Sequence, residues 1–150
     1  MNTQIPGLSR VELQVTGGER HIIVPRLAAG LPLLAIGLAH VFDASAPMRP
    51  LVEAAGIPAA TVLSPTAVAV EILAGTLLLV GLYARLGALL AIPTMAVAVY
   101  THLAIDAWPN GEEPPIALPV VVLACAGYVL WRGAGAWSLD RKLTTPEMSR

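Results

Sequence analysis

Four stretches of the chain are apolar over almost their whole length, and they predict four membrane-spanning helices. They contain 19, 22, 20 and 17 residues, in the order Val24–Phe42, Val62–Tyr83, Leu86–Ile105 and Pro115–Trp131. A hydrocarbon core about 30 Å thick requires about 20 helical residues, with a range of about 17–25. Because lipid offers a backbone no hydrogen-bond partners, each stretch is expected to be a helix that satisfies its own amides.

The connections between these stretches predict how the helices are arranged. Only Ala84 and Arg85 join the second and third spans, so these two helices are expected to be antiparallel neighbours. The longer connections, Asp43–Thr61 and Asp106–Pro114, are rich in Pro, Ala and Gly and are expected to be short, constrained caps. The sequence therefore predicts an all-α, four-helix transmembrane bundle in residues 24–133. Residues 1–23 and 134–150 form its tails.

The N-terminal tail carries a weaker pattern. Val11, Leu13 and Val15 alternate with polar residues, and a glycine pair separates them from the segment His21–Val24. Alternation of this kind weakly predicts a strand or hairpin. The other interpretation is a partly ordered tail.

Composition and charge agree with a membrane protein. Hydrophobic residues make up 56% of the chain and charged residues 13%, whereas about 25% is usual in soluble domains. Only Arg26 and Glu71, of 19 charged residues, lie inside the four apolar stretches. A net charge of −1 lacks the basic footprint of a nucleic-acid-binding protein, and a single cysteine excludes an intrachain disulfide framework.

The positive charges predict the orientation of the bundle. Eight cationic residues belong to the side that carries both tails: Arg10, Arg20, Arg26, Arg85, Arg132, Arg141, Lys142 and Arg150. Arg49 alone belongs to the opposite side. Because cationic flanks are retained on the cytoplasmic side, both termini are expected to be cytoplasmic.

Glu71 is the acidic residue whose position is costly, since it lies in the middle of the second span. Its i−4, i+3 and i+4 neighbours, Ala67, Ala74 and Gly75, are small, so another helix is able to approach this face closely. We therefore expect Glu71 to point into the bundle. It is either a proton-carrying or ligand-binding group, or a protonated side chain that hydrogen-bonds a neighbouring helix.

Two histidines lie at the outer ends of spans, each with an aspartate near it. Asp43 follows His40 by three residues and Asp106 follows His102 by four, so each pair shares a helical face. A carboxylate in this position orients a histidine. With Tyr100 and Thr101 nearby, these residues predict a polar pocket suited to a quinone head group or a metal, or else interfacial histidines satisfied locally. The metal is the weaker alternative, because the spacing alone specifies no coordination geometry.

Arg26 and Arg132 lie near the inner ends of their spans. Each is expected to extend its guanidinium to the interface; for Arg26, pairing with Asp140 in the C-terminal tail is the alternative.

Several segments resemble the DoxX family of small four-helix bacterial membrane proteins. They are Arg26-Leu27, Gly56-Ile57-Pro58, Glu71-Ile-Leu-Ala-Gly75, Leu78-Leu79-Val80-Gly81-Leu82 with Arg85, and Gly133-Ala-Gly-Ala-Trp137-Ser138-Leu139-Asp140. The resemblance covers roughly residues 24–142. It implies a multi-pass protein of the bacterial inner membrane, and it carries over Arg26, Glu71, Gly75, Gly81, Arg85, Ser138 and Asp140 as the family pattern.

The resemblance also implies a function in membrane redox chemistry, because family members are named after subunits of a quinol oxidase and of a thiosulfate–quinone oxidoreductase. The first hypothesis is therefore an accessory subunit of a quinone-linked respiratory or redox assembly, without an intrinsic cofactor but with a bound quinone, and with other membrane subunits as partners. The alternative is a purely structural subunit that packs against a larger complex. A small-solute transporter is the third hypothesis, supported by Glu71 alone.

Overall fold

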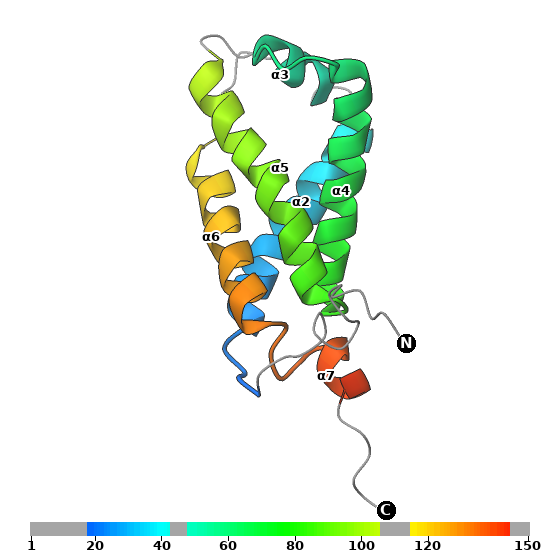
Figure 1. The fold of residues 1–150 in the computed structure, drawn as a ribbon, viewed down its shortest axis with the longest axis vertical. Coiled ribbons are helices and arrows are strands. Elements are labelled where there is room, and N and C mark those ends of the chain that lie inside the picture. The colour runs from blue at the N-terminus through cyan, green and yellow to red at the C-terminus, as the bar shows by residue number, and fades with distance from the viewer. Residues whose placement is uncertain (1–17, 43–47, 106–114, 145–150) are drawn as a thin grey trace, which may run out of the picture.

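The computed structural model describes residues 18–42, 48–105 and 115–144, and every regular element in them is a helix. Four long helices are α2 (Ile23–Phe42), α4 (Ala60–Val80), α5 (Ala84–Ala104) and α6 (Ala117–Arg132). Two short helices, α3 (Met48–Ala54) and α7 (Leu139–Thr144), lie at opposite ends of the bundle (Figure 1). The prediction of an all-α bundle of four long helices is confirmed.

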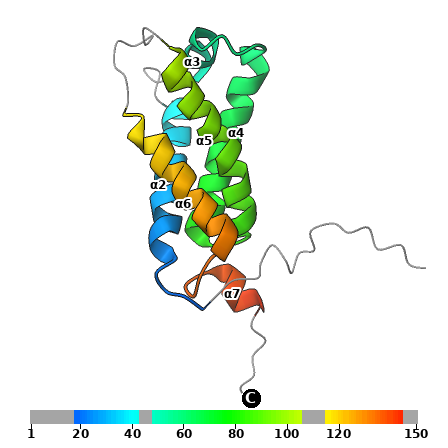
Figure 2. The ribbon, with the colours of Figure 1, turned by 60° about the vertical axis from the view of Figure 1, so that its left-hand side comes forward.

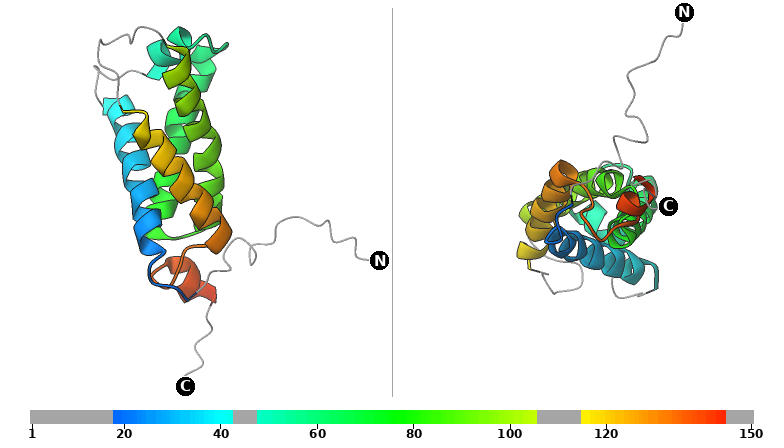
Figure 3. Two further views of the ribbon diagram at one scale, coloured as in Figure 1. Left: turned by 90° about the vertical axis from the view of Figure 1, so that its left-hand side faces the viewer. Right: turned by 90° about the horizontal axis from the view of Figure 1, so that it is seen from below.

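The four long helices form a closed ring. α2 packs against α4 and α6, and α5 packs against the same two helices, as Figure 2 shows for α6, which lies beside both α2 and α5. Successive long helices run in opposite directions, so the beginning of α2 and the short α7 lie at the same end of the bundle (Figure 3). The opposite end is covered by α3, which contacts α4 and α5.

The distribution of side-chain sizes fits a helix bundle in lipid. Small residues occupy the centre, among them Ala74, Ala88 and Ala126, none of which is exposed, while large apolar residues such as Leu31 and Leu73 are at least half exposed. Helices in a bilayer pack through small residues, because lipid accepts the large apolar side chains. α2, α4 and α5 are long and apolar enough to cross a membrane, and α6 is a shorter apolar helix.

Gly75 marks a close approach between α4 and α2. A Cβ atom added to Gly75 would lie 2.7 Å from the Leu34 backbone nitrogen and 3.0 Å from the Gly30 carbonyl oxygen, both on α2. These neighbours are backbone atoms, so they move only if the helices move. The small face predicted around Glu71 is therefore the face on which α2 packs.

Replacing Gly75 by alanine is expected to destabilise the protein by about 1–3 kcal/mol, the usual cost of forcing extra volume into a packed interface. Gly127→Ala on α6 is the matched control, since a Cβ there meets no atom within 4 Å. The control is expected to be neutral or to gain up to about 1 kcal/mol from helix propensity. Denaturant titration of both variants in micelles, followed by circular dichroism, checks this; equal effects would contradict the assigned contact.

The turn between α4 and α5 differs from its predicted position. The sequence predicted that the second span ends at Tyr83 and that the third begins at Leu86. In the structure, α4 ends at Val80 and α5 begins at Ala84. Gly81 adopts a left-handed conformation (φ 68°), and its N–H bonds to the Leu77 carbonyl, which ends α4. The two helices are antiparallel neighbours, as predicted.

The structure refines one expectation about the connecting segments and corrects another. The segment Asp43–Thr61 was expected to be a short, constrained cap, and the structure adds that its middle forms the helix α3, where Arg49 and Glu53 pair at i,i+4 (2.6 Å). The weak strand prediction over His21–Val24 is wrong, because a turn there leads directly into α2. The alternating residues Val11–Val15 lie outside the described residues.

Candidate functional site

Glu71 points into the bundle, as predicted. It lies in the middle of α4 and is only 4% exposed. Its Oε2 atom is buried and has no hydrogen-bond partner among the described residues. The interpretation of Glu71 as a side chain that hydrogen-bonds a neighbouring helix therefore has no support at this atom. A buried polar atom without a partner requires an explanation, and one explanation is a ligand.

Glu71 lines a cavity of about 240 Å³ at the centre of the bundle, here called the central cavity. All four long helices and α3 contribute to its wall, and most contributions are apolar. The lining residues are Pro32, Leu33, Ile36, His40, Met48, Leu51, Glu71, Met95, Ala98, Thr101, His102, Pro115, Leu118, Pro119 and Val122.

A second cavity of about 340 Å³, the α4–α5 cavity, is also lined by Glu71. α3, α4 and α5 form its wall, and Thr66 and Thr94 are its polar members besides Glu71. Met48, Glu71 and Ala98 line both cavities. Glu71, whose Oε2 atom is unpartnered among the described residues, therefore borders two largely apolar spaces.

The structure brings both predicted histidines to the central cavity. His40 at the end of α2 and His102 at the end of α5 line it together with Glu71. The two histidines are 62 positions apart in the sequence, and each is 31 positions from Glu71. The His102 Nδ1 atom lies 2.7 Å from the Ala98 carbonyl oxygen, which orients the ring. Their predicted partners, Asp43 and Asp106, lie outside the described residues.

Two further residues alter the predicted pocket. Tyr100 is 53% exposed and lines neither cavity, so the structure does not place it with Glu71. Thr101, its neighbour on α5, faces the central cavity instead. Helical geometry explains the exchange, because adjacent residues point about 100° apart around the helix axis.

A second polar cluster, the C-terminal clamp, lies at the α7 end of the bundle. Arg26 is only 3% exposed, and its guanidinium donates hydrogen bonds to the carbonyl oxygens of Ala134 (2.8 Å) and Trp137 (2.7 Å). The expectation that Arg26 extends to the interface is therefore wrong. The chain after α6 folds back over the guanidinium and supplies the acceptors that the apolar helices lack.

Asp140 completes the clamp. It is 1% exposed, and its carboxylate accepts hydrogen bonds from the backbone N–H groups of Tyr83 (2.7 Å) and Ala84 (3.0 Å). No side-chain cap comes from the local N-cap residue of α5, so a residue 56 positions away caps this helix. A carboxylate at a helix N-terminus also interacts favourably with the helix dipole.

Three other residues of the family pattern, Gly81, Arg85 and Ser138, also make contacts at this end of the bundle. Ser138 donates to the Gly135 carbonyl oxygen (2.7 Å), and a Cβ added to Gly81 would lie 2.6 Å from Arg26 Nη1. Arg85 donates to the Trp131 carbonyl oxygen (3.3 Å). These residues hold the helix ends together, and none of them lines the cavities around Glu71.

Arg132, at the end of α6, makes an ion pair that was not predicted. Its guanidinium pairs with the Glu19 carboxylate, with Nε 3.2 Å from Oε2, and it lies 5.4 Å from the centre of the Trp131 ring. The first described residues of the chain are thereby fixed to the end of α6. Sequence spacing gave no signal for this pair, since 113 positions separate the two residues.

This architecture defines the class of protein. A ring of apolar helices with small residues inside, large apolar residues outside and a buried carboxyl at mid-span is a multi-pass integral membrane protein.

The comparisons with known proteins identify the family. The DoxX family model matches residues 21–104. An uncharacterized membrane protein of Mycobacterium tuberculosis is 34% identical in an alignment of 140 residues that covers 85% of this chain and 83% of the relative. The chain therefore belongs to the DoxX family. No solved structure matches it.

Proposed function

We propose that this protein is an accessory subunit of a quinone-linked redox assembly, and that it holds a quinone head group in the central cavity against Glu71. The observation that supports this proposal is that Glu71 lines two apolar cavities while its buried Oε2 atom lacks a hydrogen-bond partner among the described residues. A ligand that supplies the missing hydrogen bond accounts for a carboxyl in this position.

The chemistry of the cavities fits a quinone. Binding sites for small molecules are mostly apolar, span about 300–1,000 Å³ and carry a few convergent polar groups. The two cavities, of about 240 and 340 Å³, adjoin at Glu71. A protonated Glu71 would donate a hydrogen bond to a quinone carbonyl, and an ionised one would accept a hydrogen bond from a quinol hydroxyl. Thr101 and His102 provide further polar atoms on the same wall.

The distribution of positive charges favours a particular membrane orientation. We infer that the protein lies in the bacterial inner membrane with both tails in the cytoplasm, as the excess of Lys and Arg on the tail side favours. In this account the chain positions the quinone and its proton-carrying group, and a partner membrane subunit supplies the electron-transfer centre.

Two variants of α5, each with one alanine replaced by phenylalanine, test the binding site. Ala98 lines both cavities, whereas Ala96, two residues before it on the same helix, is exposed on the outer surface. Ala98→Phe is expected to weaken binding of decylubiquinone or menadione at least tenfold, because the ring fills the space at the cavity boundary. Ala96→Phe adds the same ring on the outside and is expected to bind as the wild type does.

The measurement is a calorimetric titration of each quinone into the protein in lipid nanodiscs. Equal affinity in both variants, or no saturable binding by the wild type, would contradict a quinone site in these cavities. That result would favour the alternative function, a purely structural subunit that packs against a larger complex.

A further inference from the structure

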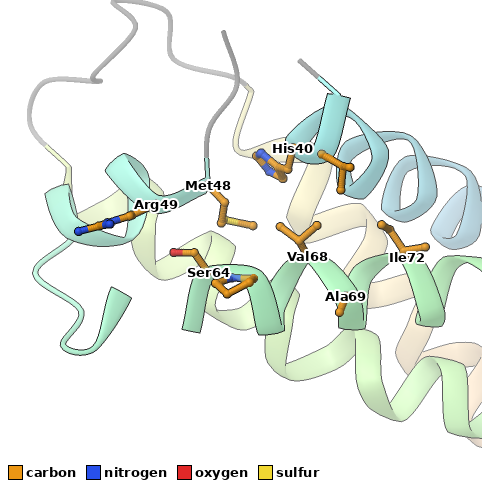
Figure 4. A pocket seen from close by; sticks show the side chains of 9 residues that line it. His40, Met48, Arg49, Ser64, Val68, Ala69 and Ile72 are labelled. Carbon is orange, nitrogen blue, oxygen red and sulfur yellow. The ribbon is translucent and has the colours of Figure 1, made fainter. Parts of the chain in front are cut away.

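A third pocket, of about 490 Å³, lies between the ends of α2, α3 and α4 and is called the α2–α4 pocket here (Figure 4). α2 and α4 are in close contact at Gly37, where an added Cβ would lie 2.8 Å from Ile72 Cγ1. Ile72 also borders the pocket. The pocket therefore begins where this contact ends and the two helices separate toward α3.

The wall of the α2–α4 pocket is apolar on the side that faces outward. Val41 of α2 is 54% exposed, Ala69 of α4 is exposed, and both line the pocket. Both belong to helices long and apolar enough to cross a membrane. Arg49, paired with Glu53, lies at the α3 edge of the pocket. An apolar wall with a charged rim matches the boundary between acyl chains and head groups.

The pocket adjoins the central cavity through shared residues. His40 and Met48 line both spaces, and Met48 lines the α4–α5 cavity as well. Figure 4 shows the Met48 side chain between His40 on α2 and Ser64 on α4. Methionine is flexible and adapts its shape to what packs against it. A route from the α2–α4 pocket to the central cavity would therefore pass His40 and Met48, of which Met48 is the more adaptable side chain.

Ser64 gives the α2–α4 pocket a polar anchor. It is 4% exposed, and its buried Oγ atom has no hydrogen-bond partner within the described part of the chain. Glu71 shows the same combination of burial and missing partner. The route thus carries one unpartnered polar atom near its entrance and another at its inner end.

We propose that the α2–α4 pocket is a binding site and entrance for a membrane-dissolved amphiphile, which reaches Glu71 laterally from the bilayer. Its polar group hydrogen-bonds Ser64 Oγ, and its apolar body packs on Val41, Val68 and Ile72. This inference deepens the proposed function by restricting the ligand to lipid-soluble molecules. It is tested without a quinone, so the two proposals fail separately.

The experiment compares two carbodiimides that modify protonated carboxyl groups. Protein in liposomes is treated with lipid-soluble dicyclohexylcarbodiimide or with a water-soluble ethyl-dimethylaminopropyl carbodiimide, and modification of Glu71 is followed by peptide mass spectrometry. Lateral access predicts that the lipid-soluble reagent modifies Glu71 at least tenfold faster. Equal rates, faster reaction with the water-soluble reagent, or no modification by the lipid-soluble one would overturn the inference.

Two variants locate the route. Ala69→Trp fills the exposed wall of the α2–α4 pocket and is expected to slow the lipid-soluble reaction at least tenfold, whereas Ala96→Trp on the outside of α5 leaves it unchanged. Equal rates in the two variants would place the entrance elsewhere and overturn the inference.

A competition experiment tests the role of Ser64. Decanol, a simple amphiphile with one hydroxyl, is expected to protect Glu71 from dicyclohexylcarbodiimide in the wild type. Ser64→Ala is expected to require at least threefold more decanol for the same protection. Identical protection curves would overturn the assignment of Ser64 as the polar anchor. Slower modification in Ala69→Trp together with absent quinone binding would retain the lateral route and reject the proposed function.

Discussion

Glu71→Leu is expected to make the protein more stable and to abolish quinone binding. The substitution removes a buried polar atom that has no partner among the described residues and places an apolar side chain between two apolar cavities. Leaving a buried polar group unsatisfied costs about 1–3 kcal/mol, so the free energy of unfolding is expected to rise by about that amount. A gain in stability with a loss of function is typical of residues kept for binding.

Two controls separate this effect from a general effect of hydrophobicity. Glu53→Leu makes the same change on α3, where the side chain is about half exposed and paired with Arg49, and it is expected to change stability by no more than about 0.5 kcal/mol. Glu71→Gln keeps the shape and a hydrogen-bond donor, so weakened but measurable quinone binding is expected. Unfolding titrations in micelles provide the readout, and a clear loss of stability in Glu71→Leu would show that the carboxyl is structural.

Asp140→Ala is expected to destabilise the protein by about 3 kcal/mol or more. The carboxylate accepts two backbone hydrogen bonds at the start of α5 and is 1% exposed. Hydrogen bonds to charged groups contribute about 1.5–3 kcal/mol each. Without the carboxylate, the N–H groups of Tyr83 and Ala84 lose their acceptor, and Tyr83 also holds a left-handed conformation (φ 48°).

Asp140→Asn is expected to lie between Asp140→Ala and the wild type, because one of the two acceptor oxygens remains. Lys142→Ala, on the exposed side of α7, is the control and is expected to stay within about 0.5 kcal/mol of the wild type. Thermal unfolding of the purified variants checks the order. If Asp140→Ala and Lys142→Ala unfold at the same temperature, the C-terminal clamp does not carry the stability assigned to it.

The features predictable from the sequence were those that the bilayer imposes locally. The lengths of the apolar runs predicted four helices, because each span needs about 20 apolar residues whatever its partners. The cost of a mid-span carboxyl predicted that Glu71 points inward. Both arguments need only the residues of one helix and its solvent.

The features that the sequence did not predict depend on contacts between distant segments. Asp140 caps a helix that begins 56 positions earlier, and Arg26 is covered by carbonyl groups more than 100 positions away. Neither spacing follows from helical periodicity. The helix α3 was not predicted, because its seven residues include a proline and lie in a connection rich in Pro and Ala. The role of Ser64 as a polar anchor could not be predicted, because a single serine near the start of a helix is usually a cap or turn residue.

The quinone content of the purified protein tests the central claim most directly. Wild type and Glu71→Leu are purified in parallel from native membranes in a mild detergent, extracted with organic solvent and analysed for quinones by mass spectrometry. The account predicts a near-stoichiometric quinone in the wild type and at least a tenfold lower content in Glu71→Leu. Equal content in the two proteins, or none in either, would contradict a quinone site at Glu71.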